Sequence, residues 1–159
     1  MSGRSILRMI LCVLVCLSAG WIGSMATRDA IPQWYAGLNR PAFTPPNWAF
    51  GVVWPILYVM MGVALAMVLS CGINRKVVRI AVVVFGIQLV LNAAWSLIFF
   101  GLHRIDLALV EIVLLWLAII ATMALFCRVS KVAAVMMVPY LLWVTFAIGL
   151  NAGYFILNP

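Results

Sequence analysis

Residues 77–100 read VVRIAVVVFGIQLVLNAAWSLIFF, and this stretch combines the two properties on which the fold depends. It is long and apolar enough to cross the hydrocarbon core of a bilayer, which takes about 20 such residues. It also carries Gln88, Asn92, Trp95 and Phe99 at spacings of four, three and four, so these side chains share one face of a helix. The stretch therefore predicts a transmembrane helix with one face unlike the rest.

Four further stretches are comparably apolar: roughly residues 6–26, 48–70, 106–127 and 132–157. The 159-residue chain is 68% hydrophobic and 8% charged, whereas about a quarter of the residues of a soluble domain are charged. The first run is too long for the apolar part of a signal peptide, so we interpret it as a retained helix. We predict an all-α membrane protein, a single domain over residues 1–159. It is a bundle of five transmembrane helices with a long Pro/aromatic loop between helices 1 and 2.

The basic residues are distributed unevenly between the two ends of this bundle. Seven fall on the side of the N-terminus, namely Arg4, Arg8, Arg75, Lys76, Arg79, Arg128 and Lys131. The other side has Arg28, Arg40 and Arg104, offset by Asp29 and Asp106. Basic residues concentrate on the cytoplasmic side of membrane proteins. We therefore expect a cytoplasmic N-terminus in a bacterial cell membrane, and we attribute the net charge of +7 to orientation, with no nucleic acid as partner.

Polar residues inside a bilayer need partners or a cavity, and they gather on three of the predicted helices. Besides the face on helix 3, helix 2 offers Phe50, Trp54, Tyr58 and Met61, and helix 5 offers Trp143, Phe146, Ala147, Leu150 and Asn151. Two interpretations remain open. Either the amides join the helices by hydrogen bonds and the tryptophans mark the interface, or the three faces line a pocket for a flat apolar ligand.

Conventional catalytic and metal-binding motifs are not found, so we predict no metal site and no catalytic residue of the usual kind. His103 could ligate a haem iron, but a lone histidine in a loop is more often solvated. Glu111 lies about one turn into the fourth predicted helix. We expect it to pair with Arg104 or His103, or to cap a neighbouring helix end.

Four blocks of sequence resemble the TspO/MBR family, whose members are called translocator protein, peripheral-type benzodiazepine receptor or tryptophan-rich sensory protein. Residues 34–62 contain WY, LNRPxFxPP and WPILYxMxG, and residues 88–101 contain QxxxNxxWSxxFFG. Residues 108–111 contain AxxE, and residues 138–151 contain VPYLxWxxFAxxLN. The blocks follow one another in the family's order, and a bacterial member is indicated.

The resemblance implies a receptor or sensor of five helices, usually a homodimer, with a cavity open toward the first loop, which acts as a lid. Its ligands would be protoporphyrin IX, haem and isoquinoline- or benzodiazepine-type drugs, with no cofactor required. The alternatives are a light-dependent protoporphyrin-degrading enzyme that uses Trp54 and Trp143, or a passive transporter of tetrapyrroles or sterols. A sterol is less well supported, because no basic residue follows Tyr154.

The family's pocket positions correspond to Trp54, Asn92, Trp95, Trp143, Phe146, Ala147 and Leu150, and its lid pair to Trp34 and Tyr35. Spacing adds Phe50, Tyr58 and Phe99 to the predicted ligand-binding residues. Three prolines, Pro41, Pro45 and Pro46, limit the conformations of the lid. We expect Trp34, Tyr35 and Phe43 to cover the mouth of the cavity with their polar edges in water. Small residues suggest two dimer contacts, Gly62 with Ala66 and Gly86 with Ala93.

Overall fold

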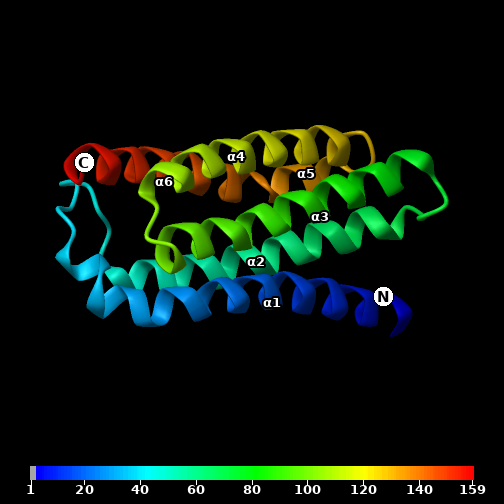
Figure 1. The fold of residues 1–159 in the computed structure, drawn as a ribbon. Coiled ribbons are helices and arrows are strands. Elements are labelled where there is room, and N and C mark those ends of the chain that lie inside the picture. The colour runs from blue at the N-terminus through cyan, green and yellow to red at the C-terminus, as the bar shows by residue number, and fades with distance from the viewer. Residues whose placement is uncertain (1–2) are drawn as a thin grey trace.

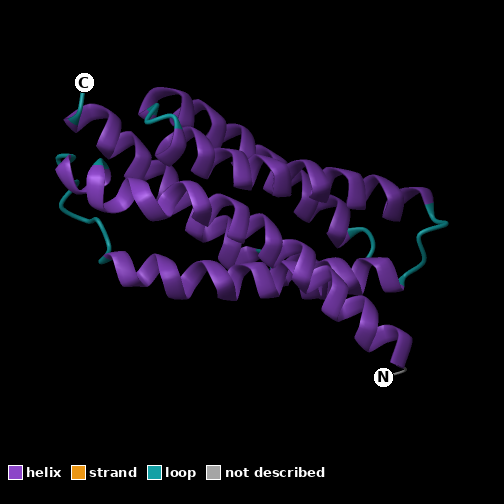
Figure 2. Ribbon diagram, turned by 60° about the horizontal axis from the view of Figure 1, so that its bottom comes forward, coloured by secondary structure: helices purple, strands orange, loops and turns teal. Residues whose placement is uncertain are grey.

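The computed structural model describes residues 3–159, and all of its regular structure over these residues is helical (Figure 1). The elements are α1 (Gly3–Gln33), the 3₁₀ turn η1 (Tyr35–Gly37), α2 (Asn47–Ser70), α3 (Lys76–Ser96), the π turn η2 (Leu97–Gly101), α4 (Ile105–Cys127), α5 (Lys131–Met136) and α6 (Val138–Leu157). Figure 2 shows the helices running side by side, with the loops gathered at the two ends. The predicted all-α class is confirmed.

Five helical segments are long and apolar enough to span a bilayer: α1, α2, α3 with η2, α4, and α5 with α6. In the most apolar part of each, at most 44% of the residues are buried inside the protein. The remaining apolar side chains, such as Val90 and Val110, are exposed and need lipid around them. The chain is an integral multi-pass membrane protein.

The two ends of the bundle differ in what they carry. The N-terminus lies at the same end as the α2–α3 and α4–α5 connections, and the C-terminus lies beside the long first loop at the other end (Figure 1). Around the bundle, α1 packs on α2 and α3, while α4 packs on α3 and α6. The short α5 fills the space between α2 and α4.

A close backbone contact between helices involves Gly62, one of the small residues considered for a dimer. A Cβ atom at Gly62 would lie only 2.5 Å from Cα of Val13, so this glycine lets α2 pack directly on the backbone of α1. Gly62 therefore contributes to helix packing inside the bundle, which replaces its interpretation as a dimer contact. At Gly86 a Cβ atom would meet nothing within 4 Å.

One helix is longer than predicted, and another is interrupted near a proline. The apolar run ends near Ala26, but α1 continues to Gln33 because its last turns pack on η2, where Ala26 approaches Gly101. The first loop proper is shorter than predicted for that reason. The fifth span breaks at Met137, two residues before Pro139, which has no N–H for a continuous helix.

At the end of α3 the helix widens into η2, where the N–H of Leu102 reaches back to the carbonyl of Leu97. Single wide turns of this kind often occur at functional sites. Here the turn directs two consecutive residues, Phe99 and Phe100, toward the same interior space.

Candidate ligand cavity

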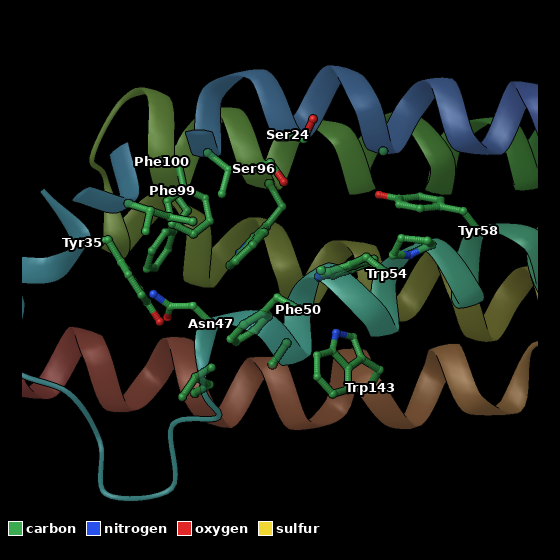
Figure 3. A pocket seen from close by; sticks show the side chains of 18 of the residues that line it. Ser24, Tyr35, Asn47, Phe50, Trp54, Tyr58, Ser96, Phe99, Phe100 and Trp143 are labelled. Carbon is green, nitrogen blue, oxygen red and sulfur yellow. The ribbon is translucent and has the colours of Figure 1, made fainter. Parts of the chain in front are cut away.

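A cavity of about 490 Å³ lies in the half of the bundle nearest the first loop. Its wall is formed by α1, η1, the first turns of α2, the end of α3 with η2, and α6 (Figure 3). A cavity of this size is typical of sites for drug-sized ligands, which occupy roughly 300–1,000 Å³.

Nine of the twelve predicted ligand-binding residues line this cavity: Tyr35, Phe50, Trp54, Tyr58, Trp95, Phe99, Trp143, Ala147 and Leu150. They come from helices far apart in sequence, and their rings provide most of the wall. Trp54 stacks on Tyr58 with ring centroids 5.6 Å apart, and Phe50 meets Trp143 edge to face at 5.8 Å. Such faces suit a flat apolar guest.

Asn92 does not line the cavity but supports its wall from behind. Its side-chain oxygen accepts a hydrogen bond from the Tyr58 hydroxyl, and its Nδ2 donates to the Tyr140 hydroxyl over 3.0 Å. The Tyr140 hydroxyl in turn donates to Oε1 of Gln88, also over 3.0 Å. The amides therefore join the helices, as the first interpretation predicts, while rings in front of them line a cavity.

A second amide, that of Asn151, lines the cavity near the loop and also joins helices there. Nε1 of Trp95 donates to Oδ1 of Asn151 over 3.1 Å, and Nδ2 of Asn151 donates to the Ile105 carbonyl at the start of α4. The Trp95 indole is thus held by α6 and stacks on Phe99 with centroids 5.1 Å apart. Its ring orientation is fixed before any ligand arrives.

Trp34 and Phe146 also lie outside the cavity lining. Trp34 stacks on His103, with ring centroids 4.4 Å apart and planes inclined by 17°, and so joins the start of the first loop to the α3–α4 connection. Phe146 packs between Phe43 and Trp143. His103 does not line the cavity, so it is not placed to ligate a metal there.

The expected exposure of the Tyr35 hydroxyl is wrong. Tyr35 is only 5% exposed, and its hydroxyl accepts a hydrogen bond of 2.7 Å from Tyr154. Burial, followed by this hydrogen bond, raises the pKa of Tyr35 above its ordinary value. The two neutral hydroxyls close the loop end of the cavity instead of facing water.

The expected pairing of Glu111 is also wrong. Arg104 forms its ion pair with Asp106, two residues away, at 2.6 Å. Glu111 faces into the bundle and is 7% exposed, and neither of its oxygens has a hydrogen-bond partner among the described residues. Arg104 pairs with Asp106 and not with Glu111, because Arg104 and Asp106 are close in sequence and meet at the surface where α4 begins.

A whole wall of the cavity was missed by the sequence interpretation. The residues of α1 that line it recur every three or four positions along one face, with Gly20 and Trp21 adjacent: Leu17, Gly20, Trp21, Ser24, Thr27 and Ile31. Most of these side chains are small, singly polar or aliphatic, and a tryptophan in a predicted transmembrane helix also suits the membrane interface, so the pattern does not stand out in the sequence.

Polar groups in the wall are few. Nε1 of Trp95 donates to Asn151, whereas Nε1 of Trp143 is buried without an acceptor. Figure 3 shows this indole beside Phe50 and Trp54. Among the described residues no group of three or more His, Cys, Asp or Glu could hold a metal ion.

Comparison with known proteins identifies the family. The family model described as TspO/MBR family matches residues 12–157. The chain is 47% identical over 156 residues to "Tryptophan-rich protein TspO" of Chlorobaculum tepidum, covering 98% of this chain and 99% of the relative. It is 37% identical over 146 residues to "Protein CrtK" of Rhodobacter capsulatus, covering 92% and 89%. It is 39% identical over 136 residues to the human "Translocator protein", covering 82% and 78%. The chain therefore belongs to the TspO/MBR family, whose membership supports a role as a membrane sensor or transporter.

Proposed function

We propose that this protein is a membrane receptor or sensor that binds porphyrins, above all protoporphyrin IX, and flat drugs of the isoquinoline or benzodiazepine type. The observation that carries the proposal is the cavity of about 490 Å³ walled by the faces and edges of aromatic rings from four helical segments. Stacking on such rings rewards a wide, flat and apolar guest.

The chemistry of the lining favours a metal-free porphyrin over a haem held by an axial bond. The lining residues include no His, Cys or Met, and the hydroxyls of the lining tyrosines, the remaining type of haem ligand, are engaged in hydrogen bonds with other side chains. Haem would be held through its ring faces and edges in the same way as protoporphyrin IX. A rotation of the Trp143 indole would offer its unpaired N–H to an acceptor on the guest, which removes the cost of a buried unpaired donor.

The names of two relatives are consistent with a role in ligand sensing or movement. One, 36% identical over 132 residues, is called "Tryptophan-rich sensory protein", and another is called "Translocator protein". Sensing requires only that binding alters the protein, and the loop that contacts the cavity through Tyr35 is an element that binding would affect.

We further infer that the N-terminus is cytoplasmic and that the membrane is that of a bacterial cell. The end of the bundle that carries the N-terminus in Figure 1 has seven basic residues, and the loop end has three. The cavity and the first loop would then lie on the outer side of the membrane.

The test is a titration of the purified protein with protoporphyrin IX, followed by quenching of tryptophan fluorescence. Ala147→Leu adds bulk inside the cavity and should weaken binding by at least about tenfold, the usual effect of one misfitted group in an apolar pocket. Ala121→Leu makes the same change on the exposed face of α4 and should leave the affinity unchanged. Equal affinities of both variants and the wild type would reject the cavity as the binding site.

A further inference from the structure

The first loop is fastened to the C-terminal end of α6 by a reciprocal pair of asparagines. The N–H of Asn39 donates to Oδ1 of Asn158 over 2.9 Å, and Nδ2 of Asn158 donates back to the Asn39 carbonyl over 3.1 Å. Nδ2 of Asn39 also donates to the Leu157 carbonyl over 3.2 Å. Three hydrogen bonds thus join the loop to the last turn of the chain.

Two further contacts hold the loop against the same helix. Tyr35 and Tyr154 share their buried hydrogen bond, and Pro41 packs so closely on Gly153 that a Cβ atom there would lie 2.7 Å from Cγ of Pro41. The loop end of the cavity is therefore closed by contacts at several positions along α6. Passage of a ligand at this end would require all of them to separate together.

The side of the cavity between α1 and α2 is built differently. The two helices touch where Gly62 meets Val13, and again where a Cβ atom at Gly20 would overlap the Tyr58 ring. Beyond Gly20 the helices turn to different partners. Gly23 packs on Ser96 of α3, whereas Phe50 near the start of α2 packs on Trp143 of α6. The two helices therefore separate from one another toward the loop.

Exposure shows that the cavity reaches the outer surface at this separation. Trp21 and Ser24 on α1, and Gly51 and Pro55 on α2, all line the cavity and are all exposed, Trp21 by 66%. Exposed lining residues on both helices place an outward opening of the cavity between them. Figure 3 shows the same arrangement from close by, with Ser24 of α1 on one side of the hollow and Trp54 of α2 on the other.

Taking the proposed function as its basis, we propose that ligands enter and leave the cavity sideways, through the opening between α1 and α2, while the loop stays fastened. A fifth exposed lining residue, Asn47, begins α2 beside the loop, whereas the other four lie further along the membrane-spanning helices α1 and α2, so the opening between these helices faces lipid. The ligand class is accordingly a flat aromatic molecule that dissolves in the bilayer first and reaches the protein by lateral diffusion. This route differs from the opening toward the loop that the family resemblance implies.

The test places an obstacle in the opening. Gly51→Trp adds an indole where a Cβ atom meets nothing within 4 Å, so it occupies the opening without displacing a neighbour. Gly149→Trp is the matched control, because Gly149 is equally free of neighbours but lies on the exposed face of α6 outside the lining. Each variant is reconstituted in phosphatidylcholine vesicles, and stopped-flow emission of protoporphyrin IX gives its association and dissociation rates.

We expect Gly51→Trp to slow both association and dissociation by about tenfold, since an indole must rotate away before each passage. An indole that only disturbed the binding site would speed dissociation, so slower dissociation separates a blocked opening from lost affinity and from a failure of the titration that tests the proposed function. Gly51→Leu should produce a smaller slowing, and Gly149→Trp none.

A second variant tests the loop as the alternative route. Asn158→Ala removes two of the three hydrogen bonds between Asn39 and the C-terminal turn. If ligands pass sideways, both rates stay within about twofold of the wild type. If Asn158→Ala accelerates exchange while Gly51→Trp leaves it unchanged, ligands pass under the loop and the lateral route is overturned.

Discussion

The contact between Gly62 and Val13 offers the sharpest test of how the bundle is packed. Replacing Gly62 with alanine places a methyl group 2.5 Å from Cα and 2.8 Å from the backbone nitrogen of Val13. Backbone atoms cannot rotate aside, so α1 has to move as a whole, and overpacking of this kind costs about 1–3 kcal/mol. The same change gains up to about 1 kcal/mol because alanine favours a helix over glycine.

Gly86→Ala separates the gain in helix propensity from the cost of overpacking. A Cβ atom at Gly86 meets nothing within 4 Å, so this variant receives the helix-propensity gain alone. The difference between the two variants therefore measures the overpacking, about 1–3 kcal/mol, or roughly 2–4 °C in melting temperature for each kcal/mol in a chain of this length. Thermal unfolding of both proteins in the same detergent gives that difference. Equal melting temperatures would show that α1 and α2 are not in backbone contact, and the description of the opening beyond them would fail as well.

Three other predictions concern single side chains. Tyr140→Phe leaves Nδ2 of Asn92 and Oε1 of Gln88 unpaired in the core and should lower stability by about 2–4 kcal/mol in thermal unfolding; an unchanged melting temperature would refute the network. Glu111→Leu removes two unpartnered buried oxygens and should raise stability by about 1–3 kcal/mol by the same assay, whereas a loss would reveal a partner for the acid. Because the pKa of Tyr35 is raised, its hydroxyl contributes fully to loop docking below about pH 10, the ordinary tyrosine value. This contribution is lost only as the pH rises through the higher pKa of the folded protein. Protease resistance of the loop should therefore be constant from about pH 7 to about pH 9, and a decline within that range would contradict the burial of this hydroxyl.

Much of the fold follows from the sequence because the bilayer leaves few choices. A run of about 20 apolar residues can satisfy its backbone in lipid only as a helix, so five runs dictate five spans. The ends of the helices were harder to predict. The last turns of α1 are polar, and they are helical because they pack on η2, a tertiary contact that local composition does not reveal.

The candidate site was predictable where its residues stand out chemically. Tryptophan and tyrosine at helical spacing marked the walls supplied by α2, α3 and α6, and these residues do line the cavity. Spacing could not tell which polar residue faces the cavity and which stands behind it. Asn92 is one helix turn from Trp95, yet it points toward Tyr140 and the core. Their ligand-binding roles stay predictions until the titration is made.

The π turn η2 makes the shape of this region depend on the number of residues in the turn. A wide turn holds one residue more than a regular α-helical turn, so removing one residue between Leu97 and Gly101 would restore uninterrupted α-helical geometry. The wide turn and the regular turn each complete one revolution, so the connection that presents His103 to Trp34 would still start from the same side of the helix. Within the turn, consecutive residues would lie about 100° apart around the axis, so Phe99 and Phe100, which both line the cavity, would spread apart. The length of this segment, as much as its composition, thus sets the shape of the hollow beside it.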